Sequence, residues 1–179
     1  MKTRAALFAL CLLLLACACA HAADVELGSR KFKHLSLAVG QTPPDCRGVV
    51  NHGAVLSYIH DALHASLAGR FEFVHTDNAP VLMTTWDCLL LTDDTERGGG
   101  RSIGFAINIT MSFYRPFRED LAYLYAAPWT KSTLLFIPHR DFSQAFFNSL
   151  LDDSLAEFSA LWLADHPAPL EQRQGGAAQ

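Results

Sequence analysis

The chain has 179 residues, half of them apolar, and a formal net charge of −4. A chain of this length and composition can bury one core of ordinary size, so we expect a single domain. Removing the basic residues Lys2 and Arg4 with a leader segment leaves 12 of the 14 basic residues against 18 acidic ones, a net charge of about −6. This mildly acidic chain has no Lys or Arg cluster, which excludes nucleic acid as an expected partner.

The first 22 residues have the pattern of a signal peptide. Lys2 and Arg4 give a positive start, residues 5–16 are apolar, and Ala20 and Ala22 occupy the alternate positions that signal peptidase requires to be small. Because the apolar run is too short for a permanent bilayer anchor, we expect no transmembrane span in the mature chain. We predict cleavage after Ala22 and a periplasmic, outer-membrane-associated or secreted protein.

Cys17 offers a second processing route. It follows Leu14, Leu15 and Ala16, which together approximate the lipobox of bacterial lipoproteins, although Leu15 is bulkier than the residue usual at its position. We favour simple cleavage over lipidation at Cys17, because the two routes compete for one short segment and the first fits it better. Both routes lead out of the cytoplasm.

Export gives the remaining cysteines an oxidising environment. After cleavage at Ala22 the mature domain keeps only Cys46 and Cys88. An even pair in an exported protein predicts a disulfide between them. The alternative is two unpaired thiols, with Cys88 as a small apolar residue of the core.

The first half of the mature chain predicts strand, helix, strand, strand. Residues 30–39 alternate apolar and polar side chains, as a strand does, and residues 51–68 repeat apolar side chains at helical spacing, with Asn51 as the N-cap. Residues 70–75 form a short alternating strand. Residues 81–92 are an apolar run that we expect to be covered on both faces in its second half.

The second half is organised around residues 103–115, which alternate apolar and polar side chains over their whole length. We expect this long half-buried strand to end at Pro116, and residues 119–126 and 133–137 to continue the sheet. Asp141 then caps an amphipathic helix that stops at Pro167, and residues 167–179 have the composition of a disordered tail.

Together these elements predict one α+β domain over residues 23–166. We expect a two-layer sandwich, in which an antiparallel meander sheet carries two helices on one face. Each amphipathic helix needs an apolar surface to cover, and the alternating strands offer one.

The chain contains no local motif that indicates a catalytic residue, a cofactor or a metal. His60 and His64 are four residues apart and share one side of a helix, but two histidines without a firm third ligand indicate solvated surface residues. We therefore expect neither cofactor nor metal and favour a protein without catalytic activity. A hydrolase whose site is assembled only in three dimensions stays open.

Partner binding is indicated at the end of the long strand, where aromatic and Arg residues gather. These types are enriched at the energetic centres of protein interfaces. An ordinary strand end, with its long side chains extended over apolar surface, explains the same residues. The candidates are Tyr114, Arg115, Phe117 and Arg118.

The exported start, the helix of residues 51–68 running into Phe71 and Phe73, Asp87 entering an apolar strand and the long alternating strand form one pattern. It resembles the small envelope accessory lipoproteins of Gram-negative bacteria, of the ABC-transport-auxiliary and lipopolysaccharide-assembly type. The resemblance lies in topology and implies a non-enzymatic accessory protein that binds an envelope protein or a lipid-like ligand. A secreted inhibitor or immunity protein is the alternative from another class.

Overall fold

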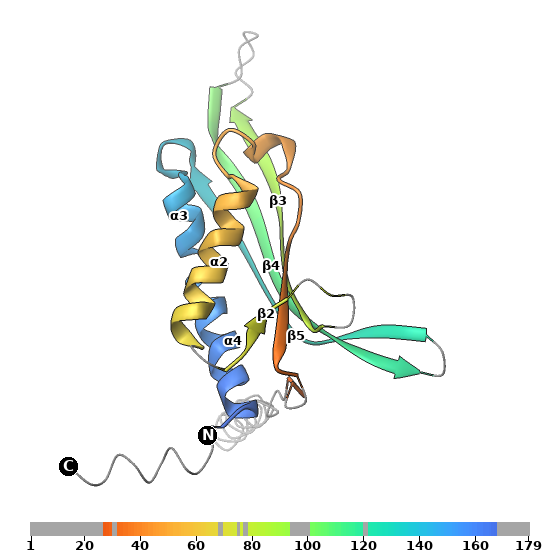
Figure 1. Cartoon of the computed structure of the whole chain (residues 1–179). Helices are drawn as coiled ribbons and strands as arrows, with labels where there is room; N and C mark the ends of the chain where they lie inside the picture. Colours follow the sequence, from red (N-terminus) through yellow and green to blue (C-terminus); the bar gives the residue numbers. More distant parts are fainter. Residues whose placement is uncertain are drawn as a thin grey trace, which may run out of the picture.

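The computed structural model describes residues 27–29, 32–67, 70–74, 76, 79–93, 101–119 and 122–167. Within them a layer of helices lies against one face of a five-stranded sheet (Figure 1). This confirms the predicted α+β class and the placement of the helices on one face. The predicted signal peptide with Cys17, and all but the first residue of the predicted tail, lie outside the described residues.

The sheet is mixed, so the prediction of an antiparallel meander is only partly right. The strands lie in the order β2-β1-β3-β4-β5, and β1 runs parallel to both β2 and β3, whereas β3, β4 and β5 pair antiparallel. The helix between β1 and β2 carries the chain back to the starting end of the sheet, and such a crossover makes neighbouring strands parallel. The strands are β1 (His34–Val39), β2 (Glu72–Phe73), β3 (Val81–Asp93), β4 (Arg101–Glu119) and β5 (Ala122–Pro138).

The first long helix follows the predicted pattern. α2 spans His52–Ser66, and the side chain of Asn51 accepts a hydrogen bond from the backbone N–H of Ala54 at 3.0 Å, as an N-cap does. Val55, Ile59 and Leu63 are its buried residues, at the spacing of one helix face.

The C-terminal helix is broken in two, which corrects the expectation of one helix capped by Asp141. Asp141 ends a short 3₁₀ turn, and the side chain of Ser143 caps α3 (Gln144–Ser149) by accepting from Phe146 N–H at 3.2 Å. A turn then separates α3 from α4 (Asp152–Asp165). The apolar periodicity continues across the turn, because Phe147, Leu151 and Phe158 all reach the same core, and this concealed the break.

Pro116 does not end the long strand, which continues to Glu119. β3 begins at Val81 opposite Tyr114, so β4 pairs with β5 alone beyond that point. On an edge strand the missing N–H of proline leaves no ladder bond unmade. Residues 119–126 and 133–137 were predicted as separate strands. Glu119 is instead the end of β4, whereas residues 122–126 and 133–137 belong to the single strand β5, with Pro128 at an irregularity in its pairing.

The core lies between the helices and the alternating row of β4. Five side chains of β4 are buried on the helix side of the sheet, at most 4 % exposed: Phe105, Ile107, Ile109, Met111 and Phe113. Aromatic rings of α4 complete this layer, since Phe158 lies 5.5 Å from Phe113 and Trp162 lies 6.0 Å from it between ring centroids.

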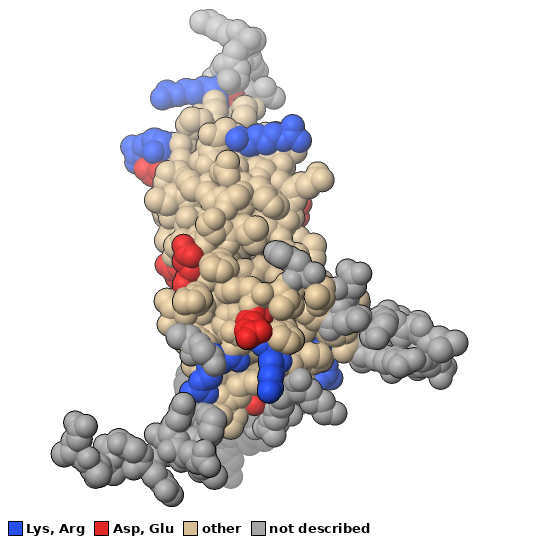
Figure 2. All heavy atoms as spheres, viewed as in Figure 1, with Lys and Arg blue, Asp and Glu red and all other residues tan. Residues whose placement is uncertain are grey.

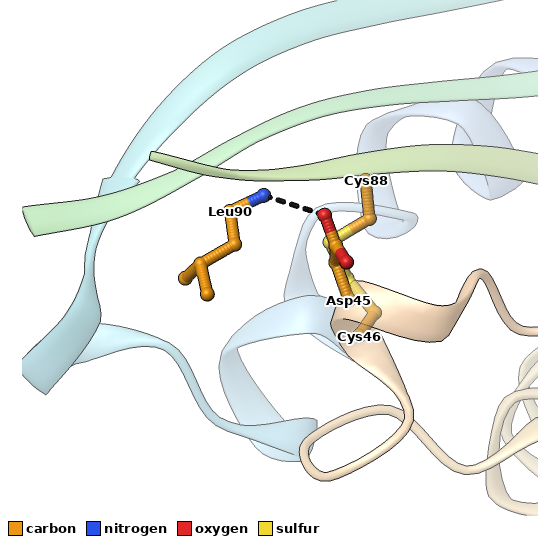
Figure 3. Close-up of a disulfide and its surroundings, with 4 residues drawn as sticks. All are labelled: Asp45, Cys46, Cys88 and Leu90. Carbon is orange, nitrogen blue, oxygen red and sulfur yellow. Dashed lines mark hydrogen bonds between the residues drawn. A yellow bond between two sulfur atoms is a disulfide. The ribbon is translucent and has the colours of Figure 1, made fainter. Parts of the chain in front are cut away.

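A disulfide joins Cys46 to Cys88, the predicted pair, with their Cα atoms 6.0 Å apart. Figure 3 shows that the backbone N–H of Leu90 donates to a carboxylate oxygen of Asp45, at 2.9 Å, beside the disulfide. The two links fix the 3₁₀ turn Pro44–Cys46 against β3. The turn precedes α2, so they also define where α2 begins.

We predict that replacing both cysteines by Ala lowers the free energy of unfolding by about 3–4 kcal/mol, because the disulfide closes a long loop in the unfolded chain. Urea denaturation of the oxidised protein and of the double variant measures this. The reduced native sequence is the control and should match the variant. A loss below about 1 kcal/mol would contradict a structural role for the disulfide.

Candidate functional site

The end of the β4–β5 hairpin projects from the domain as an arm (Figure 1). The strand pairing is irregular between Phe113 and Arg115, where the arm begins, and such a bulge bends a ladder. Tyr114 lies at this bend and is half-buried, as is Arg115. The backbone at Phe117 and Arg118 pairs with β5, but their side chains lie outside the described part of the chain.

Arg115 is engaged within the domain. Gly28 has a φ of +61°, and a β-carbon at Gly28 would overlap the guanidinium group of Arg115, so only glycine suits this position. The next residue, Ser29, donates from both its N–H and its hydroxyl to Asp165 at 2.7 and 2.8 Å. Arg115 therefore helps to hold the start of the domain against the end of α4.

The second face of the sheet, which the helices do not cover, is nearly without charge. We call this surface the open face. Asp87 is the one charged residue among those that form its central part, whereas Asp93 and Arg101 pair with each other at the far ends of β3 and β4. Its polar centre is a hydrogen-bonded set, because Ser132 donates to Asn108 at 2.9 Å and exchanges a hydrogen bond with Thr110 at 3.0 Å. The open face consists of Val81, Met83, Thr85, Asp87, Leu89, Ala106, Asn108, Thr110, Ser112, Ser132, Leu134 and Phe136.

One end of the open face carries exposed large apolar side chains. Leu89 is 58 % exposed, Leu134 76 % and Phe136 53 %, and we call these three residues the apolar patch. Ala106 pairs with both Leu89 and Phe136, so they flank it on the two neighbouring strands. Gly104 permits the arrangement, because a β-carbon there would lie 2.7 Å from the Phe136 ring. The patch is open to solvent, which makes it a candidate docking surface.

The apolar patch overturns one prediction. The second half of the run at residues 81–92 is not covered on both faces, since Leu89 and Leu90 are exposed. The patch was not predicted, because the sequence of an apolar run does not distinguish a strand buried on both faces from one with an exposed face. The signal that was available is the alternation of β5, in which Leu134 and Phe136 share the face of the polar residue Ser132.

A small polar network joins the sheet to α4 on the helix side. Lys131 forms an ion pair with Glu157 at 2.7 Å, and the indole N–H of Trp129 donates to the same carboxylate at 2.9 Å. The hydrogen bond from Lys131, followed by that from Trp129, lowers the pKa of Glu157.

A side-chain hydrogen bond also joins α2 to α4. Tyr58 donates to Asp152, and this hydrogen bond raises the pKa of the Tyr58 hydroxyl.

A cavity of about 300 Å³ lies between α2 and the strands β1 and β2. Leu37, Leu56, Phe73 and Val74 line it with apolar atoms, and its polar lining comes from Ser57, His60 and Asp61. The cavity suits a small apolar group rather than a charged one.

On the side of the molecule shown in Figure 2, Lys and Arg gather towards the two ends and the middle is largely uncharged.

Of the two α2 histidines singled out in the sequence, His60 lines this cavity. The rings of His60 and His64 lie 6.1 Å apart, His60 packs on Phe73 at 4.3 Å, and its Nδ1 lies 3.1 Å from Asp61. Among the described residues, no group of three His, Cys, Asp or Glu side chains is placed to hold a metal ion. Ser57 shares the cavity but has no hydrogen bond to His60 in the structure, so this arrangement does not activate the serine as a nucleophile.

No family model and no curated protein matches the chain. Three solved structures share parts of its fold at low similarity. A dodecamer of a PelC variant from Paraburkholderia phytofirmans is 14 % identical, with 74 % of this chain and 88 % of that chain covered and a TM-score of 0.40. A minor lipoprotein from Acinetobacter baumannii is 12 % identical, with 75 % and 92 % covered and a TM-score of 0.38.

The third structure is the rare lipoprotein B from Shewanella oneidensis, which is 11 % identical, with 82 % of this chain and 99 % of that chain covered and a TM-score of 0.30. Similarity at this level does not identify a ligand or partner for this protein. In the described part of the chain, no helix combines the length and the apolar character needed to cross a membrane.

We predict that the stabilising effect of Glu157 depends on pH. Because its pKa is below the ordinary value of 4.5, its contribution is complete above that value and is lost as pH falls through the lowered pKa. The difference in unfolding free energy between the native protein and Glu157→Gln should be constant from about pH 7 to pH 5 and shrink towards about pH 2. Urea titrations at each pH measure it.

The control is the same comparison in a Lys131→Met background, which removes the main cause of the lowered pKa. There the pH dependence of the difference should be weaker. A difference that is independent of pH in the native background would contradict the role assigned to the ion pair.

Proposed function

We propose that this protein is an exported, non-enzymatic accessory protein of the bacterial envelope that binds another envelope protein through the open face. The observation that carries the proposal is the composition of this face. Of the residues that form the open face only Asp87 is charged, and it lies near the exposed Leu89, Leu134 and Phe136. Interface centres are depleted in charge and enriched in large apolar and aromatic side chains.

The polar centre of the open face fits the same role. The hydroxyl groups of Thr110 and Ser132 and the amide oxygen of Asn108 bond to one another, so these atoms keep their partners when the region is covered. A partner can therefore pack on them at little desolvation cost. The arm of residues 115–126, with Tyr114 at its base, lies at the other end of β4 from the apolar patch and gives the partner a second point of contact.

A lipid-like ligand is the second candidate, and the cavity between α2 and β1 favours it. Its apolar lining of Leu37, Leu56 and Phe73 suits one end of an acyl chain, and the polar groups of His60 and Asp61 suit a headgroup with hydrogen-bonding atoms. A secreted inhibitor or immunity protein would use the open face in the same way as an envelope accessory protein. A dispersed hydrolase would instead require a nucleophile activated inside the cavity.

Photo-crosslinking tests the role of the open face. Leu89 is replaced by benzoylphenylalanine, the protein is produced in the organism that carries the gene, and the intact envelope is irradiated. We expect one discrete protein adduct, which is lost when Ala106→Lys places a charge beside position 89. The matched control carries the crosslinker at Ala156, which is exposed on α4 in the helical layer and should give no such adduct.

The identity of the adduct separates the candidates. An envelope protein supports the proposal, whereas a secreted enzyme supports the inhibitor. Equal adducts from positions 89 and 156, or an adduct that Ala106→Lys leaves intact, would refute binding through the open face. If position 89 gives no protein adduct and a fluorescent fatty acid binds saturably, the lipid-like ligand replaces the protein partner.

A further inference from the structure

The two edges of the sheet differ greatly in length. At one edge β2 pairs over only two residues, and a very short edge strand is a poor template for another chain. At the other edge β5 extends over 17 residues, and no other strand of the described chain pairs with its outer side. Its backbone N–H and C=O groups on that side are available for a further strand.

The usual protection of an edge strand is missing from the last part of β5. Proteins shield such edges with charged side chains and prolines, and residues 132–137, which precede the terminal Pro138, contain neither. The nearest charge, Lys131, is turned onto the helix side of the sheet, where Glu157 binds it at 2.7 Å. The charge nearest to the segment is therefore paired with a carboxylate on the helix side of the sheet.

The same segment carries two of the three side chains of the apolar patch. Leu134 is 76 % exposed and Phe136 is 53 % exposed, and both lie on the open face two positions apart. Side chains on one face of antiparallel neighbours pair directly across the strands. A strand added here would gain backbone hydrogen bonds and apolar contacts together.

We propose that this strand is the β5 of a second copy, paired antiparallel about a two-fold axis at Leu135. In such an interface one residue of the first copy meets a second residue of the other copy, and the reverse contact repeats across the axis, so it is favourable only where no like charges meet. The pairing sets Leu134 of each copy against Phe136 of the other and places Thr133 opposite Ile137. Lys131 lies outside the paired segment, and the two sheets join into one.

An extended peptide from another protein is the alternative occupant of this edge, because backbone pairing does not depend on the partner's sequence. Self-pairing is favoured because the segment is neutral, apolar on the open face and symmetric in bulk about Leu135. The proposal concerns the edge of β5 and does not depend on what binds the open face.

Sedimentation equilibrium of the exported, oxidised protein tests this pairing. We expect a dimer whose dissociation constant rises at least tenfold in Leu134→Lys/Phe136→Lys, because four ammonium groups then meet across the axis. The matched control is Leu89→Lys, a similarly exposed leucine of the same face that lies outside β5, which should leave the dimer intact. Circular dichroism verifies that each variant is folded.

Charge complementation between variants is the decisive experiment. Leu134→Glu/Phe136→Glu should also be monomeric alone, and mixing it with the double Lys variant should restore a heterodimer. A native protein that remains monomeric, a dimer unaffected by the double Lys variant, or a dimer weakened equally by Leu89→Lys would overturn the proposal. Because the crosslinking at Leu89 reports on a different residue, the two proposals can fail separately.

Discussion

The fold depends on burying one row of side chains on β4. Phe105, Ile107, Ile109, Met111 and Phe113 are all turned to the helices, and each such side chain contributes about 1.5–3 kcal/mol when it leaves water. Because successive side chains of a strand point to opposite faces of the sheet, the residues between these five lie on the other face. Burial of the five side chains therefore places Ala106, Asn108 and Thr110 on the open face. The orientation of β4 thus determines both the core and the open face.

The functional surfaces follow from what the helices leave uncovered. Helices pack on one face only, so the second face and the β5 edge keep contact with water. On that face hydroxyl and amide groups bond to one another around Ser132, and at one end the polar pattern gives way to Leu89, Leu134 and Phe136. Charge is placed elsewhere: Lys131 is bound to Glu157 on the helix side and Arg115 lies against Gly28. The proposed contact with a macromolecule rests on this surface, where Asp87 is the single charged residue, and on the β5 edge beside it.

Local patterns in the sequence were sufficient for the elements whose signal is local. The alternation of residues 103–115 predicted the central strand, Asn51 predicted the cap of α2, and the even pair Cys46 and Cys88 predicted the disulfide. The parallel placement of β1 was missed because strand direction depends on a connection through space. The prediction that Pro116 ends the strand was wrong because a strand accepts proline only where no neighbour needs its N–H, and this depends on where β3 begins. The exposure of Leu134 and Phe136 was not predictable, because the identity of an apolar residue does not indicate whether another element covers it. Of the predicted partner-binding residues, Arg115 lies against Gly28, and partner binding at Tyr114, Arg115, Phe117 and Arg118 stays a prediction.

The central claim is that two neighbouring residues of β4 serve opposite purposes. Ile109 is 4 % exposed in the core, whereas Thr110 lies on the open face. The most direct test is the urea unfolding of Ile109→Lys and Thr110→Lys beside the native protein. The account predicts that Ile109→Lys loses several kcal/mol or fails to fold, because it buries an unpaired charge, and that Thr110→Lys keeps a cooperative transition within about 1 kcal/mol of native. Equal destabilisation by the two substitutions would contradict it.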